Sequence, residues 1–182
     1  MPFFPQVMVS PAPRTMDTAN LFLEATGISV GSHDLGIHLE PVQSLYEGTM
    51  QPEGSRLFQK IGYAPLRDYL MCEDDEDRKT AQNVLGTYAH TVTDEIIRVL
   101  ELEKQKPNSA NNQNAQGLTL CLVAHAIYLP AAALAVATLA DCDASSIDLL
   151  LRTNTREAEG YLIYLDTKKV TYLARPSERQ GE

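Results

Sequence analysis

Short apolar runs alternate with segments of helical periodicity along this chain. Strand-like runs lie at residues 7–9, 37–39 and 118–124, and shorter helical patterns lie at 15–26, 65–71, 130–140 and 145–150. The strongest helical pattern spans residues 74–104, where apolar residues recur at intervals of three and four. Strands that alternate with helices predict an α/β layered domain.

Two further segments complete the predicted architecture. Residues 161–165 and 170–173 predict an antiparallel hairpin at the end of the sheet. Residues 47–63 are rich in glycine, proline and polar side chains, which predicts a long loop with one helical turn. We expect a single domain over residues 1–176 and a disordered tail over residues 177–182.

Composition and charge narrow the classes of function. The net charge of -9 argues against an electrostatic nucleic-acid binder, which normally carries a basic face. An anion site stays open, because a phosphate pocket needs only a few focused cations. The three cysteines form no Cys-x-x-Cys pair and MPFFPQ predicts no signal peptide, so we expect a cytoplasmic protein. No Cys/His spacing predicts a metal ion.

A membrane span has to be weighed for residues 118–140, which carry no formal charge and are long enough to cross a bilayer. The alternative is a buried strand, a turn and a buried helix. His125 and Pro130 favour the alternative, because both are costly in the middle of a lipid-exposed span. We therefore predict no membrane span.

Three polar residues follow the predicted strands: Arg14 the first, Glu47 the second and His125 the third. Ligands of α/β folds bind beyond the carboxyl ends of the strands. An arginine that grips phosphate oxygens, a glutamate that protonates a leaving oxygen and a histidine that stabilises phosphoryl charge would form a phosphoryl-transfer site. Structural roles stay open as well: Arg14 can cap a helix or pair with Asp17, Glu47 can be a surface acid, and His125 can be a core histidine.

Three segments resemble motifs of the histidine phosphatase (phosphoglycerate mutase-like) superfamily. SPAPRTMDTA, residues 10–19, resembles its Ser-Pro-x-x-Arg-x-x-x-Thr-Ala motif. LEPVQSLYEGT, residues 39–49, resembles the segment that carries its acidic residue, and LCLVAHAIYLPA, residues 120–131, resembles the segment of its second catalytic histidine. The segments stand in the family's order. The nearest branch contains the ubiquitin-associated, SH3-containing tyrosine phosphatases and the ecdysteroid-phosphate phosphatases.

This resemblance implies a three-layer α/β/α phosphoglycerate mutase-like fold and phosphomonoester hydrolysis without a metal or another cofactor. Arg14 matches the arginine that binds the phosphoryl group, Glu47 the acid that protonates the leaving group, and His125 the histidine that contacts the phosphoryl group. Ser10 and Thr18 match structural positions, a strand-end turn and a helix-packing residue. The implied ligand is a phosphorylated small molecule or a phosphoprotein.

The sequence departs from the family in one motif. The family's nucleophilic histidine belongs to an Arg-His-Gly motif at the end of its first, central strand, and this sequence contains no Arg-His-Gly. Loss of the nucleophile removes covalent catalysis. Three explanations stay open: an incomplete part of a longer phosphatase, a pseudophosphatase that binds a phosphorylated ligand, or a structural subunit whose sheet is completed by a partner or a second copy. A sheet without its first strand is expected to have a gap or unpaired edges.

Overall fold

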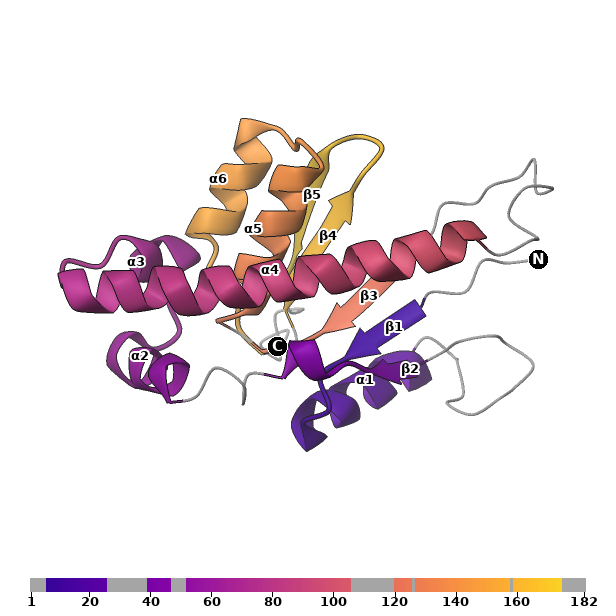
Figure 1. Ribbon diagram of the computed structural model, residues 1–182, viewed down its shortest axis with the longest axis horizontal. Helices are drawn as coiled ribbons and strands as arrows, with labels where there is room; N and C mark the ends of the chain where they lie inside the picture. Colours follow the sequence, from indigo (N-terminus) through magenta and orange to yellow (C-terminus); the bar gives the residue numbers. More distant parts are fainter. Residues whose placement is uncertain are drawn as a thin grey trace, which may run out of the picture. The chain divides into compact units, whose positions relative to one another are not determined.

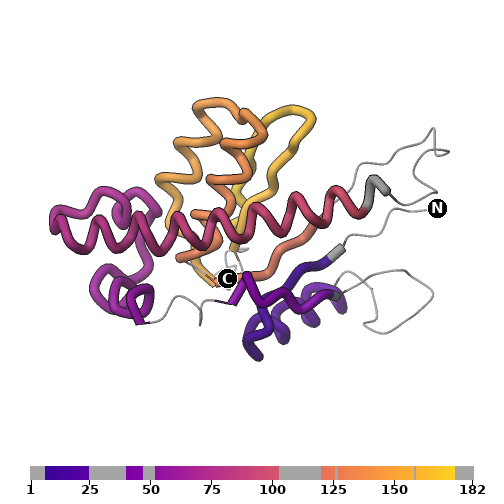
Figure 2. Tube along the Cα trace, in the orientation of Figure 1, coloured from indigo at the N-terminus to yellow at the C-terminus, as the bar shows by residue number. Residues whose placement is uncertain are grey.

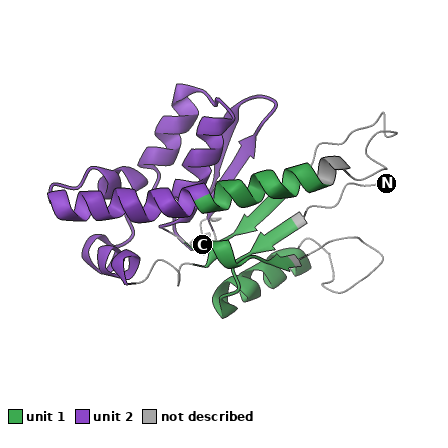
Figure 3. Cartoon of the chain, in the orientation of Figure 1, with its two compact units in different colours: residues 1–49, 91–125 green, residues 50–90, 126–182 purple. Residues whose placement is uncertain are grey.

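A computed structural model describes residues 6–25, 39–46, 52–105, 120–125, 127–157 and 159–174. The chain is mixed α/β and divides into two compact units (Figure 3). Unit 1 holds Met1–Thr49 and Thr91–His125, and unit 2 holds Met50–His90 and Ala126–Glu182. The long helix α4 (Asp75–Gln105) is continuous and contributes to both units. Among the described helices, none has the length and apolar character that crossing a bilayer requires.

Unit 1 is built on a parallel sheet with the strand order β2-β1-β3 (Figure 1). The strands are β1 (Gln6–Val9), β2 (Leu39–Pro41) and β3 (Leu120–Val123). In the middle strand, Val7 pairs with Leu39 on one side and with Cys121 on the other. We expected a gap or unpaired edges in the sheet. Because β1 and β3 are direct neighbours, no gap lies between the described strands, and β2 and β3 are the edge strands of the described sheet. All three carboxyl ends meet at one edge.

Helix α1 (Pro13–Ala25) covers one face of this sheet, and the chain turns from β1 directly into it (Figure 2). Pro13 suits the first turn because its missing N–H has no partner to lose there. The helix therefore begins two residues before the predicted start. Val7 and Val9 pack with Ala19 and Leu23 in a buried cluster. The alternate residue of β1, Met8, is fully buried as well, so both faces of the strand are covered.

In unit 2, two helices pack on one face of an antiparallel hairpin. The elements are α5 (Leu129–Leu139), α6 (Ala144–Arg152), β4 (Gly160–Tyr164) and β5 (Lys169–Leu173). Ala137, Leu150 and Val170 are the centre of their core. The predicted hairpin is confirmed, but its place at the end of the sheet is wrong: among the described strands, β4 and β5 pair with each other and form a two-stranded sheet of their own.

Two shorter helices precede α4, namely α2 (Glu53–Ile61) and α3 (Leu66–Leu70). The short helix expected within residues 65–71 is confirmed. The prediction of a long loop with one helical turn over residues 47–63 is wrong for residues 53–61, all of which form α2, and residues 47–51 lie outside the described residues. That prediction weighted glycine and proline, whereas α2 buries Gly54 and Leu57 and its Lys60 binds Asp77 of α4.

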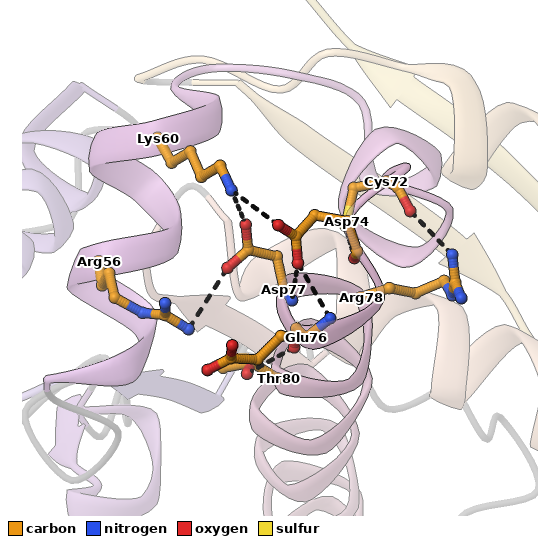
Figure 4. A network of polar contacts seen from close by, with 8 residues as sticks. All are labelled: Arg56, Lys60, Cys72, Asp74, Glu76, Asp77, Arg78 and Thr80. Carbon is orange, nitrogen blue, oxygen red and sulfur yellow. Dashed lines mark hydrogen bonds and ion pairs between the residues drawn. The ribbon is translucent and has the colours of Figure 1, made fainter.

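A polar network joins α2 to the first turn of α4 (Figure 4). Asp77 is only 3% exposed, and its carboxylate accepts a hydrogen bond from Lys60 and forms an ion pair with Arg56 at 3.4 Å. Asp74 caps the same turn, since its Oδ1 accepts the N–H groups of Glu76 and Asp77 at 2.9 and 3.0 Å. Acidic side chains are favoured at this position by the helix dipole.

Candidate functional site

Two of the three predicted site residues are described, and both lie at the carboxyl edge of the parallel sheet of unit 1. Arg14 lies in the first turn of α1, which follows β1, and His125 lies two residues after β3. The third, Glu47, lies outside the described residues. β1 and β3 run side by side in the same direction, which brings their following residues to one place (Figure 1).

Arg14 and His125 are in direct contact. Nη2 of Arg14 lies 2.9 Å from Nδ1 of His125, and the other ring nitrogen, Nε2, lies 3.0 Å from Oγ of Ser10. His125 is 5% exposed and Ser10 is fully buried, whereas Arg14 is exposed. The imidazole is therefore held at both nitrogens, and the arginine is the member of the group that reaches solvent.

The contact with Arg14 assigns the proton on His125. A guanidinium only donates hydrogen bonds, so Nδ1 must accept, and the single proton of the neutral ring lies on Nε2 and is donated to Ser10 Oγ. Burial, followed by the positive charge of Arg14, lowers the pKa of His125 to about 4, so the ring is neutral at pH 7. In this state Nε2 cannot take the proton of the Ser10 hydroxyl, and the two side chains do not form a nucleophile–base pair.

Ser10 is held in place by the backbone around the strand end. Its N–H donates to the carbonyl oxygen of Val123 at 2.9 Å, which extends the β1–β3 pairing by one residue. The buried Thr15 hydroxyl lies 2.7 Å from the carbonyl oxygens of both Ser10 and Ala12. The sequence predicted only a turn role for Ser10. The sequence feature that could have identified Ser10 as a site residue is its position as a small polar side chain directly after a strand.

Other predicted features can be placed as well. Thr18, expected to pack the helix, is instead exposed, and its hydroxyl donates to the carbonyl oxygen of Arg14 at 2.8 Å. Ala19 is the residue that packs at this point of α1. Within the part of the chain that the structure describes, no group of three or more His, Cys, Asp or Glu side chains could hold a metal ion.

The arrangement can bind an oxyanion. A guanidinium presents a planar fork of N–H donors that matches two oxygens of a phosphate or carboxylate group. The imidazole beside it offers a nitrogen that can accept or donate, according to its protonation. No protein-family model, curated protein or solved structure matches this chain, so the chemistry of the site rests on its own geometry.

Proposed function

We propose that unit 1 binds a phosphoryl group, carried by a small molecule or a phosphoprotein, at the carboxyl edge of its parallel sheet. Arg14 is the principal phosphate ligand and His125 lies beside it. The observation that carries the proposal is the 2.9 Å contact between Arg14 Nη2 and His125 Nδ1. It joins a cation and an imidazole that are 111 positions apart in the sequence at the edge where α/β folds bind ligands.

The local charge of Arg14, not the net charge of the chain, supports an oxyanion as the ligand. The chain carries a net charge of -9, whose overall field repels anions, so the attraction has to come from a local cation. Among the described residues at this edge of the sheet, Arg14 is a cation, and it is exposed. Because this charge is exposed, we expect binding to weaken as the salt concentration rises.

We also propose that the chain belongs to the histidine phosphatase superfamily and has its three-layer α/β/α fold. It is supported by the neighbouring positions of the strands that precede Arg14 and His125, and by α1 on one face of the sheet. A second helical layer is supported by the ion pair between Arg98 and Glu40 at 3.6 Å, which ties residues 91–105 of α4 to β2. The role of Glu47 as the acid for the leaving group stays a prediction.

For these 182 residues, the geometry favours binding over hydrolysis. His125 is neutral and held at both ring nitrogens, and it does not activate the Ser10 hydroxyl. The sequence contains no Arg-His-Gly that would supply the nucleophile of the family. Phosphomonoester hydrolysis is the alternative that the resemblance implies. Turnover of an aryl phosphate that is lost in His125→Ala would favour that alternative.

The test is isothermal calorimetry with inorganic phosphate at pH 7 and low salt. We expect Arg14→Ala to weaken binding by at least about tenfold, because a hydrogen bond to a charged group contributes about 1.5–3 kcal/mol. Arg98→Ala is the matched control: it removes an arginine of the same unit that pairs with Glu95 and Glu40, and we expect unchanged binding. Absence of phosphate binding by the wild type, or equal effects of the two substitutions, would disprove the proposal.

A further inference from the structure

We propose that Ser10 is the positioning residue of this site: it holds His125 through Nε2, while Nδ1 exchanges the Arg14 guanidinium for the bound anion and takes up a proton. This inference rests on the proposed phosphoryl site. It assigns a role to a residue that the motif resemblance treats as part of a turn, and it adds a proton to the binding reaction.

The exchange follows from the hydrogen-bond chemistry of the three partners. Without ligand, Nδ1 accepts from Arg14 Nη2 at 2.9 Å. A phosphate oxygen that binds Arg14 is also an acceptor, so an unprotonated Nδ1 beside it would place two lone pairs against each other. One proton from solvent on Nδ1 turns this nitrogen into a donor to the same oxygen. Only hydrogen bonds change partners, and no covalent bond other than the new N–H is formed or broken.

Ser10 suits this exchange because its hydroxyl is neutral and can accept from Nε2 in both states of the ring. The distance of 3.0 Å between Ser10 Oγ and Nε2 is therefore compatible with neutral and with charged imidazole. A carboxylate at this position would instead favour the charged ring at all times. Since the backbone of Ser10 is fixed by Val123 and Thr15, the ring keeps its orientation while its charge follows the ligand.

The charged and titratable groups around His125 agree with a ring that charges only when an anion is present. The strands β1 and β3 contribute no charged side chain, and burial raises the pKa of the Cys121 thiol, which stays neutral. On β2, Glu40 forms an ion pair with Arg98. Among the described residues of unit 1, Arg14 is the charged group that acts with burial to keep the pKa of His125 at about 4. An anion bound to Arg14 offsets its charge and raises that pKa.

Histidine side-chain NMR of the uniformly ¹⁵N-labelled chain tests the exchange at pH 7, without and with saturating inorganic phosphate. His125→Asn identifies the His125 signals among the four histidines. We expect the Nε2-protonated neutral ring without ligand and protonation of both nitrogens with phosphate. If calorimetry detects phosphate binding that Arg14→Ala abolishes, and His125 nevertheless stays neutral, the inference is wrong and the proposed function stands. If calorimetry detects no phosphate binding, the proposed function fails first and the inference fails with it.

The role of Ser10 is tested separately with two variants. In Ser10→Ala, Arg14 still fixes the neutral tautomer without ligand, so the change is expected with phosphate: Nε2–H of the charged ring loses its acceptor, the doubly protonated fraction of His125 falls, and phosphate affinity is about fivefold to tenfold lower. Ser10→Thr retains the hydroxyl and should restore the doubly protonated ring with phosphate and most of the affinity. Full protonation of His125 with phosphate and wild-type affinity in Ser10→Ala would overturn the positioning role. If Ser10→Ala does not fold, the wild-type NMR measurement still decides the proton exchange.

Discussion

Gly54 in α2 is a position where one added methyl group probes the packing of unit 2. A Cβ atom at Gly54 would lie 1.9 Å from Oη of Tyr128, 3.1 Å from its Cζ and 3.6 Å from Cγ1 of Val84. Tyr128 is 2% exposed, and its ring packs against that of Tyr88 with centroids 4.8 Å apart. The phenol therefore cannot move away from a new side chain without disturbing this packing.

The expected change in the free energy of unfolding is the sum of two opposing effects of Gly54→Ala. Inserting a methyl group into a packed core costs about 1–3 kcal/mol, and a contact of 1.9 Å with a buried tyrosine belongs in the upper part of that range. Alanine in a helix interior stabilises by about 0.5–1 kcal/mol relative to glycine, and the gain at Gly54, the second residue of α2, is at most this large. We expect a net loss of about 1–2 kcal/mol in the free energy of unfolding, which lowers Tm by about 2–8 °C for a protein of this size.

Gly86→Ala provides the matched control, because Gly86 lies in α4, is exposed, and has no atom within 4 Å of a Cβ position. Thermal unfolding followed by circular dichroism should show Gly86→Ala at or above the wild-type Tm. Tyr128→Phe removes Oη, so combining it with Gly54→Ala should recover part of the loss in a double-mutant cycle. If Gly54→Ala stabilises the protein as Gly86→Ala does, the close approach of Gly54 to Tyr128 is incorrect.

The remaining two predictions concern buried ionisable groups. Asp77→Ala removes the carboxylate that Lys60 binds, and urea unfolding should show a free energy of unfolding lower by about 1.5–3 kcal/mol. Asp75→Ala, on the exposed side of the same turn, is the control and should change this free energy by less than about 0.5 kcal/mol. Equal losses in the two variants would contradict the role of Asp77. Because the pKa of His125 falls from 6.5 to about 4 on folding, the unfolded state binds a proton that the folded state does not, and stability should decrease as the pH falls through this window. His125→Asn should lack this component, and superimposable pH profiles of the two proteins would refute it.

Local patterns in the sequence were sufficient to predict most of the helices and strands. The three-to-four periodicity and the acidic first turn predicted α4 to within one residue at each end, and Pro130 correctly marked the beginning of α5. Such features depend on residues that are close in sequence, so they can be identified without the fold. Helix α2 was missed because its glycine was interpreted as a loop signal. Gly54 instead accommodates Tyr128, a residue far along the chain.

For the candidate site as well, the sequence predicted some features and only the structure provided the others. Residue type and position after predicted strands selected Arg14, Glu47 and His125 as candidates, because strand ends in α/β folds are common ligand sites. The contact of Arg14 with His125, the proton on Nε2 and the contact of His125 with Ser10 depend on the parallel pairing of β1 with β3. That pairing joins segments more than a hundred residues apart, and local periodicity carries no information about which strands become neighbours. The tertiary structure alone therefore decided the hydrogen-bond partners of His125, and with them the chemistry that the site can perform.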